Sequence, residues 1–282
     1  MESTAVFLKW AGGKRRILPL MANFFPIKFG NYFEPFLGAG SVFFYVKQKY
    51  NPSHCTISDT NSDLINTYIH VRDNPKQLIK LLEYFKSQHS KKFYYEVREK
   101  FNKKIYIGIK RAAAFIYLNK TCFNGLYRVN SKNEFNVPFG QHKILSVYSS
   151  EVIYRASELL NDRVTIKHQD YKEIIANVKK GDFVYLDPCY DPIKKTSFAS
   201  YTPERFSLDD RTKLFVFIEE LKKKNTHIVL SNNDLPEIRK LYSGYNVHEI
   251  LAPRIIGSRI SYRADLIELL ITTKKSINYL ND

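Results

Sequence analysis

The sequence predicts an α/β protein in which one sheet of about seven strands is interrupted by a helical insertion. Short apolar runs that end in glycine or aspartate alternate with amphipathic helical patterns near the start of the chain and again after residue 145. Between these parts, residues 61–120 keep a helical period without a strand pattern. The two last apolar runs, 246–251 and 265–272, are expected to pair as a closing hairpin.

Two glycine turns mark the first part of the chain. In 7–14 (FLKWAGGK) two glycines precede Lys14, which suits backbone amides and an ammonium closing on an anionic group, although such a turn can merely start a helix. In 32–50 a short strand runs into the turn 36–40 (FLGAG) and then into an apolar helix. Glycines let the backbone approach a ligand, and a helix start offers unpaired N–H groups. The arrangement therefore predicts a nucleotide-like cofactor site, with a tight structural turn as the alternative.

Asp59 ends the next predicted strand, 55–58. A carboxylate at the end of the strand that follows a glycine turn commonly accepts hydrogen bonds from ribose hydroxyls. Aspartate is also a preferred N-cap residue for a helix such as the one that follows. Both roles stay open at this point.

The helical block 61–120 reads as an insertion between the two α/β parts. It carries many lysines and arginines, which on helices usually form a solvated surface. The loop after it, 119–140, contains Asn124-Gly125 between short apolar runs and predicts a β-hairpin. Arginine, asparagine and aromatic side chains on such a hairpin suit reading guanine in a groove or filling the space of a displaced base. An ordinary surface hairpin is the alternative.

The α/β alternation then resumes. Helices are predicted near 150–160, over 208–223 and from 234, and strands over 163–167, 183–186 and 226–230. The strand 183–186 delivers Asp187, Pro188, Cys189 and Tyr190 at its C-terminal end, where open α/β sheets place their ligands.

The tetrapeptide 187–190 has the groups needed to methylate an exocyclic amine of a base. The Asp187 carboxylate and the Pro188 carbonyl can accept hydrogen bonds from the amine and orient its lone pair, and Tyr190 can stack on an extruded base. A strand-end Asp-Pro turn is the structural alternative. In a rival mechanism Cys189 attacks a cytosine ring, but no base stands beside it in the sequence, so we expect this thiol to be inert.

Charge and cysteine content narrow the class of protein. Forty-four Lys and Arg against 28 Asp and Glu give a net charge of +16, which favours a nucleic-acid partner. The three cysteines lie far apart and show neither a metal-site spacing nor a disulfide framework. With no signal-peptide pattern and no apolar run of about 18 residues, we expect a soluble, cytoplasmic protein.

Taken together, these motifs resemble, in order along nearly the whole chain, those of the Dam-type N6-adenine DNA methyltransferases (D12 class, alpha group). The matching stretches are 7–14 (FLKWAGGK), 34–41 (EPFLGAGS), Asp59 with 61–65 (NSDLI), 124–126 (NGL) with Arg128, 135–140 (FNVPFG) and 187–190 (DPCY). The resemblance implies a Rossmann-like S-adenosyl-L-methionine-dependent methyltransferase sheet, formed by 1–60 and 145–282. It also implies an inserted, mainly helical target-recognition domain, 61–144, that bears a β-hairpin.

The resemblance also implies roles for individual residues. The family's cofactor contacts fall on Trp10, Lys14, Phe36, Gly38, Gly40, Asp59 and Asp187. Its catalytic positions fall on Asp187, Pro188 and Tyr190. Its base-reading and intercalating positions fall on Lys9, Phe123, Asn124, Leu126 and Arg128, of which Lys9 and Arg128 match the guanine-contacting pair of relatives that methylate GATC.

Two departures from the family pattern stand out. Gln141 and His142 replace a basic residue and a tyrosine, which puts outer-base and phosphate contacts in doubt, and Cys189 replaces a second proline. Because Pro188 and its carbonyl are retained, we expect activity to survive.

The resemblance implies S-adenosyl-L-methionine as cofactor, double-stranded DNA as partner, base flipping with direct methyl transfer, and neither a metal nor a membrane. A nucleoid or a viral replication site fits the expected location. A catalytically silent DNA-binding member of the fold and an RNA N6-adenine methyltransferase are the alternatives, and the oligomeric state stays open.

Overall fold

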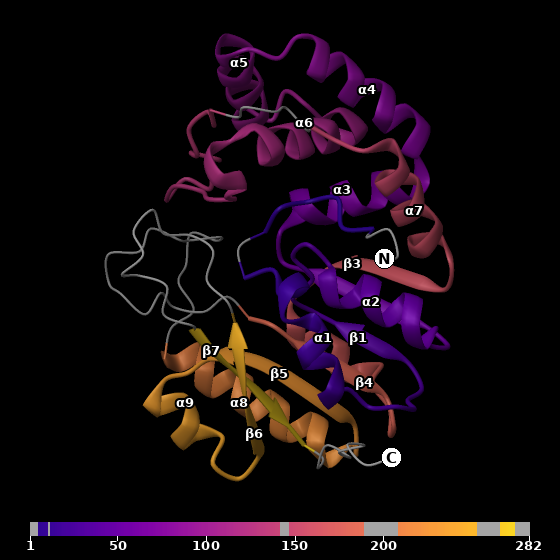
Figure 1. Cartoon of the computed structure of the whole chain (residues 1–282), viewed down its shortest axis with the longest axis vertical. Helices are drawn as coiled ribbons and strands as arrows, with labels where there is room; N and C mark the ends of the chain where they lie inside the picture. Colours follow the sequence, from indigo (N-terminus) through magenta and orange to yellow (C-terminus); the bar gives the residue numbers. More distant parts are fainter. Residues whose placement is uncertain (1–4, 11, 142–146, 189–207, 253–265, 274–282) are drawn as a thin grey trace.

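The computed structural model describes residues 5–10, 12–141, 147–188, 208–252 and 266–273. Within these ranges, seven strands form one sheet in the order β3-β2-β1-β4-β5-β7-β6 (Figure 1). The strands are β1 (Tyr32–Glu34), β2 (Cys55–Asp59), β3 (Val164–His168), β4 (Phe183–Leu186), β5 (His227–Asn233), β6 (Asn246–Ala252) and β7 (Leu266–Thr272). β1 to β5 pair in parallel, whereas β7 is antiparallel to both of its neighbours. The predicted α/β sheet with a closing antiparallel pair is confirmed.

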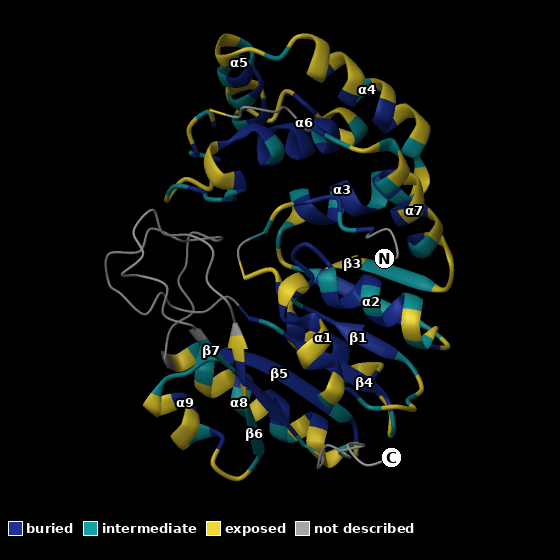
Figure 2. Cartoon of the chain, viewed as in Figure 1, coloured by how far each residue is buried: buried dark blue, intermediate teal, exposed yellow. Residues whose placement is uncertain are grey.

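Helices cover both faces of this sheet. On β4, Phe183 and Tyr185 join the apolar cluster that contains α1 and α2, whereas Val184 and Leu186 join the cluster that contains α8 and α9. The alternation arises because successive residues of a strand point to opposite faces. β4 is buried on both faces, as Figure 2 shows, and this explains its continuous apolar sequence. The described helices outside residues 61–125 are α1 (Leu18–Met21), α2 (Ser41–Tyr50), α7 (Ser150–Asn161), α8 (Leu208–Lys223) and α9 (Pro236–Leu241), with 3₁₀ helices η1 (Lys14–Arg16), η2 (Ala22–Phe24) and η4 (Tyr171–Ala176).

A group of helices between β2 and the following loop lies beside one end of the sheet (Figure 1). It consists of α3 (Ser62–Asp73), α4 (Pro75–Ser87), α5 (Lys91–Asn102) and α6 (Gly108–Thr121). α3, α4 and α5 all pack against α6, whose residues 112–119 are buried on every side. Three consecutive alanines, 112–114, let the neighbouring helices approach this central helix closely. Within the described ranges, no helix is both long enough and apolar enough to cross a membrane.

The loop after α6 differs in detail from the predicted hairpin. Asn124 and Gly125 lie in the short 3₁₀ helix η3 (Phe123–Gly125), and the chain reverses later, around 131–133. Antiparallel pairing consists of two isolated bridges, Cys122 with Phe139 and Val129 with Phe135. Asn124 and Gly125 both have left-handed backbones (φ 54° and 63°) and form a tight turn closed by the hydrogen bond from the N–H of Leu126 to the carbonyl of Phe123, but the antiparallel bridges flank 131–133 instead. We call residues 122–128 the reading loop, after the base-reading role that the family resemblance predicts for this stretch.

Candidate functional site

The carboxyl ends of three parallel strands meet at one edge of the sheet. β1 leads into the glycine turn 35–40, β2 ends at Asp59, and β4 is followed by Asp187. β1 lies between β2 and β4, so the strand order reverses between β1 and β4. Such a switch point leaves a crevice outside the carboxyl ends, which is where α/β sheets bind ligands.

The turn after β1 requires glycine at two positions. Gly38 and Gly40 both have left-handed backbones, with φ of 49° and 66°. A Cβ at Gly38 would stand 2.8 Å from Cδ1 of Trp10, and one at Gly40 would stand 2.7 Å from the hydroxyl oxygen of Tyr68. The sequence signal FLGAG therefore reflects steric necessity at both glycines.

A buried carboxyl group, Glu34, supports the start of α2. The N-cap residue Gly40 has no side chain to cap the helix. Glu34, which is 2% exposed, accepts hydrogen bonds from the Tyr32 hydroxyl at 2.5 Å and from the backbone N–H of Phe43 in the first turn. Burial raises the pKa of Glu34 well above its usual range, although the bond from Tyr32 opposes this shift. Glu34 thus holds the turn and the helix start together.

Asp59 binds the glycine turn from the neighbouring strand. One carboxylate oxygen accepts from the N–H of Gly38 at 3.1 Å and the other from the N–H of Asn61 at 2.9 Å. Burial raises the pKa of Asp59, and these backbone donors oppose the shift. The N-cap of α3 is Asn61, whose side chain accepts from the N–H groups of Asp63 and Leu64. The alternative role of Asp59 as that helix cap is therefore excluded, and its contact with a ribose stays a prediction.

Lys14 and two carboxylates form a compact ionic cluster at the same edge. The Lys14 ammonium lies 2.8 Å from Asp187, 3.0 Å from Glu268 on β7 and 2.8 Å from the carbonyl oxygen of Gly12. The Lys14 side chain is 3% exposed. Burial lowers the pKa of Lys14, but attraction to the two carboxylates outweighs it and the pKa is raised. Asp187 and Pro188 are described, whereas Cys189 and Tyr190 lie outside the described residues.

Aromatic side chains flank the glycine turn. Trp10 stands against Gly38 and stacks on Tyr127, with ring centroids 5.1 Å apart and planes 17° apart. Phe36 is half-buried and stacks on Tyr171 at 5.2 Å. The predicted cofactor residues lie at the ends of β1, β2 and β4 and on the N-terminal segment that contacts them. They are Trp10, Lys14, Phe36, Gly38, Gly40, Asp59 and Asp187.

The reading loop contacts the N-terminal segment at Lys9 and Trp10. Lys9 exchanges two backbone hydrogen bonds with the Asn119 side chain, at 2.9 and 2.7 Å, and its methylenes cover Gly125. Phe123 is 50% exposed and Asn124 is exposed, whereas Leu126 is half-buried. Arg128 donates from Nε to the Asn136 side chain at 2.7 Å, so its guanidinium is already oriented.

Positive charge gathers at this loop. Burial, together with the neighbouring charges of Lys9 and Arg15, lowers the pKa of Lys120 to about 8. Lys9 and Arg15 therefore both lie close enough to Lys120 to repel its charge. Such an arrangement suits an anionic partner, which would relieve the repulsion.

Comparison with known families identifies the class of protein. A model of the family described as D12 class N6 adenine-specific DNA methyltransferase matches residues 10–255 of the chain. The chain belongs to this family. It is an adenine-specific DNA methyltransferase, and the predicted family and enzyme class are confirmed.

Relatives of this D12 methyltransferase match it over nearly its full length. The type II methyltransferase M1.LlaDCHI of Lactococcus lactis subsp. cremoris is 40% identical over 276 residues, covering 94% of each chain. The type II methyltransferase M.MjaIII of Methanocaldococcus jannaschii is 41% identical over 282 residues, covering 94% of this chain and 97% of the relative. The DNA adenine methylase of Escherichia coli K12 is 32% identical over 280 residues, covering 98% of both chains.

Four residues of the D12 methyltransferase were not found by sequence reasoning. Glu268 completes the Lys14 cluster, Asn119 holds the backbone of Lys9, Tyr127 stacks on Trp10, and Glu34 caps α2. Glu34 and Tyr127 stand inside recognised motifs, so proximity could have drawn attention to them. Glu268 lies in an ordinary strand pattern, and its sequence carries no signal of the partner it meets.

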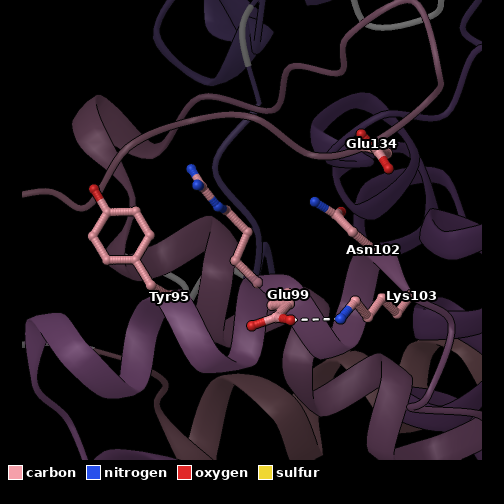
Figure 3. Close-up of a pocket in the computed structure, with 6 residues that line it drawn as sticks. Tyr95, Glu99, Asn102, Lys103 and Glu134 are labelled. Atoms are coloured by element: carbon pink, nitrogen blue, oxygen red, sulfur yellow. Dashed lines mark hydrogen bonds and ion pairs between the residues drawn. The ribbon is translucent and has the colours of Figure 1, made fainter.

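A separate hollow of about 380 Å³ lies on the helical part, where α5 faces Glu134 (Figure 3). Two of its polar side chains hold the loop: Asn102 donates to and accepts from the backbone of Phe135, and Arg98 donates to the carbonyl oxygen of Val137 at 3.1 Å, whereas Glu99 pairs with Lys103 within α5 at 2.6 Å. These contacts fix 134–137 against α5. Among the described residues, no cluster of three or more metal-ligating side chains occurs in this D12 methyltransferase.

Proposed function

We propose that this D12 methyltransferase transfers the methyl group of S-adenosyl-L-methionine to N6 of adenine within GATC in duplex DNA, after extruding the base from the helix. One observation carries the proposal. The N-terminal segment contacts the reading loop through Lys9, the glycine turn through Trp10 and the end of β4 through Lys14. A base held at the end of β4 and DNA bound at the reading loop would therefore share one short segment of chain.

The residues at the carboxyl edge fit this cofactor. Asp59 binds the glycine turn and Asp187 follows β4, the strand paired with β1. Carboxylates suit a donor that carries a sulfonium and an ammonium charge. Phe36 offers a half-buried ring, and the start of α2 offers backbone N–H groups. When bound, S-adenosyl-L-methionine supplies the electrophilic methyl group.

In the proposed reaction, Asp187 and the carbonyl of Pro188 accept hydrogen bonds from the N6 amine. These bonds draw the amine out of conjugation with the ring, so that its lone pair points at the methyl group. Lys14 fixes one oxygen of Asp187, which limits the orientations of this carboxylate. Tyr190 would stack on the extruded base, and its contribution would be about 1–3 kcal/mol.

We assign sequence reading to 61–144, joined by Lys9 of the N-terminal segment, and catalysis to 1–60 with 145–282. Lys9 and Arg128 would contact guanines, since basic side chains bind the O6 and N7 acceptors of guanine. Phe123, Asn124 and Leu126 would fill or read the space that the extruded adenine leaves. The exposure of Phe123 and Asn124 supports these roles.

The test uses labelled S-adenosyl-L-methionine with a GATC duplex and with a duplex in which the site is changed to GTAC. The second duplex keeps the base composition and changes only the order. We expect label on adenine in the first duplex and at least about 100-fold less in the second, because each wrong base pair costs about 1–3 kcal/mol. Equal labelling of both duplexes contradicts the GATC assignment, and stronger labelling of single-stranded RNA contradicts the DNA substrate.

The role of Cys189 is tested separately. Direct transfer from the cofactor to N6 needs no protein nucleophile, so Cys189→Ser should keep the rate of methylation within about twofold. Loss of activity together with a covalent protein–DNA adduct in the unchanged protein would favour attack by the thiol instead.

A further inference from the structure

The N-terminal segment joins two parts of the protein that serve different ligands. Trp10 stands between the glycine turn and the reading loop: Gly38 has no room for a Cβ beneath its indole, and Tyr127 stacks on it at 5.1 Å. The neighbouring Lys9 packs on Gly125 of the same loop. Neither the turn nor the loop can shift toward or away from Trp10 without changing this contact.

A second connection between the reading loop and the glycine turn runs through the Tyr127 hydroxyl. Tyr127 is 6% exposed, and its hydroxyl has the Asn61 side chain as hydrogen-bond partner. The backbone N–H of Asn61 in turn binds Asp59, which also binds the N–H of Gly38. The ring of Tyr127 therefore reaches the glycine turn through Trp10, and its hydroxyl reaches the turn through Asn61 and Asp59.

We propose that Tyr127 is a positioning residue that couples binding at the glycine turn to binding at the reading loop. The inference rests on the proposed function, in which S-adenosyl-L-methionine occupies the first place and GATC duplex the second. A ligand that fixes the turn also fixes Trp10 and Asn61, and through Tyr127 it fixes the loop. The second ligand then meets a loop that is already ordered and binds more tightly.

Alternative roles for Tyr127 fit the contacts less well. A side chain that only filled the core could find its hydroxyl partner anywhere, whereas the partner of Tyr127 is Asn61, which also binds Asp59 beside the glycine turn. A side chain that read DNA directly would be exposed, whereas Tyr127 is buried between Trp10, Phe115 and Phe135. Its neighbours in the loop, Phe123 and Asn124, are the exposed ones.

The test measures binding and not turnover. The dissociation constant for GATC duplex is measured by fluorescence anisotropy with and without saturating S-adenosylhomocysteine, which has no methyl group to transfer. The ratio of the two constants is the coupling factor. Calorimetric titration of S-adenosylhomocysteine with and without the duplex must return the same factor, since coupling between two binding sites is reciprocal.

Three variants separate the routes. Tyr127→Leu removes the stack and the hydroxyl, Tyr127→Phe removes the hydroxyl alone, and Phe135→Leu removes a ring from the same cluster that does not stack on Trp10. We expect a factor of about 5–150 for the unchanged protein, and one within about twofold of unity for Tyr127→Leu. Tyr127→Phe should lower the factor by about twofold or more through loss of one hydrogen bond. Phe135→Leu should weaken stability but keep the factor.

A factor near unity in the unchanged protein overturns the inference, as does an unchanged factor in Tyr127→Leu or an equal loss in Phe135→Leu. If Tyr127→Leu does not fold by circular dichroism, an unchanged factor in Tyr127→Phe overturns the hydroxyl route. The proposed function fails separately, when the unchanged protein neither binds nor methylates the GATC duplex. Methylation of GATC without coupling contradicts the role of Tyr127 alone.

Discussion

At the scale of single residues, the decisive feature is how charge is balanced at the sheet edge where the parallel strands have their carboxyl ends. A buried lysine is costly unless carboxylates compensate it, and here Asp187 and Glu268 do so from two different strands. Lys14 therefore has a structural task in addition to any contact with the cofactor. It determines where the Asp187 carboxylate stands.

Replacing Lys14 should show how much this ion cluster affects the free energy of unfolding. Lys14→Met leaves two carboxylates close together without their cation, and we expect the free energy of unfolding to fall by about 2–4 kcal/mol, less than for a fully buried pair because both carboxylates are partly exposed. Adding Glu268→Gln removes one of the two carboxylate charges that repel each other, and should restore about 1 kcal/mol or more of the free energy of unfolding. Urea unfolding of Lys14→Met, Glu268→Gln and the double variant provides the measurement, and additive effects would contradict the cluster.

Glu34 predicts a pH dependence of stability. Its pKa is raised in the folded protein, so the folded state holds a proton that the unfolded state releases near pH 4.5. The sign follows: the stability of the unchanged protein, relative to that of Glu34→Gln, should fall as pH rises from about 4.5 toward the folded pKa. Urea unfolding across pH 4 to 8 measures the difference between the two proteins. A difference that stays constant would show that the carboxyl group does not retain its proton.

At the scale of elements, the site depends on turns and loops held by neighbouring elements. The glycine turn is fixed by Trp10 from the N-terminal segment and by Asp59 from β2. The reading loop is fixed by Asn119 through Lys9 and, further along, by Asn102 on α5. The glycine turn and the reading loop are thus both held by side chains from other elements.

Alanine at Gly38 should separate backbone strain from a general glycine effect. Gly38→Ala combines a left-handed backbone with a Cβ at 2.8 Å from Trp10, and we expect it to cost about 1–3 kcal/mol of stability and to weaken binding of S-adenosylhomocysteine at least about tenfold. Gly244→Ala is the matched control, since no atom lies within 4 Å of its Cβ position. Thermal unfolding and calorimetric titration give the two quantities. Equal effects of both substitutions would argue against a special turn at Gly38.

Phe123 tests the reading loop. Phe123→Ala should slow methylation of GATC duplex by about 5–150-fold, the value of one aromatic stacking contact with a base. Stability should change by less than about 0.5 kcal/mol, because the side chain is 50% exposed. Tyr84→Ala on α4, at 55% exposure, is the control that removes an exposed aromatic ring elsewhere. A similar loss of rate in the control would remove the special role of Phe123.

At the scale of the whole molecule, the sequence predicted which segments form helices and strands better than it predicted which residues contact one another. The helix 208–223 and the closing strands were found because apolar periodicity is a local property. The meeting of Glu268 with Lys14 and the stack of Tyr127 on Trp10 join residues more than 100 positions apart, and no local pattern encodes such contacts. The reversal of the loop at 131–133 was missed because Asn124-Gly125 gave a stronger turn signal.

In the proposed reaction, Asp187 at the end of β4 orients adenine N6 within GATC for methyl transfer. Mass spectrometry of nucleosides from GATC duplex, treated with the unchanged protein or with Asp187→Asn, tests it most directly. We expect N6-methyladenine from the unchanged protein and at least about 100-fold less from Asp187→Asn at similar DNA affinity. Methylated cytosine, or an undiminished yield of N6-methyladenine from Asp187→Asn, would contradict it.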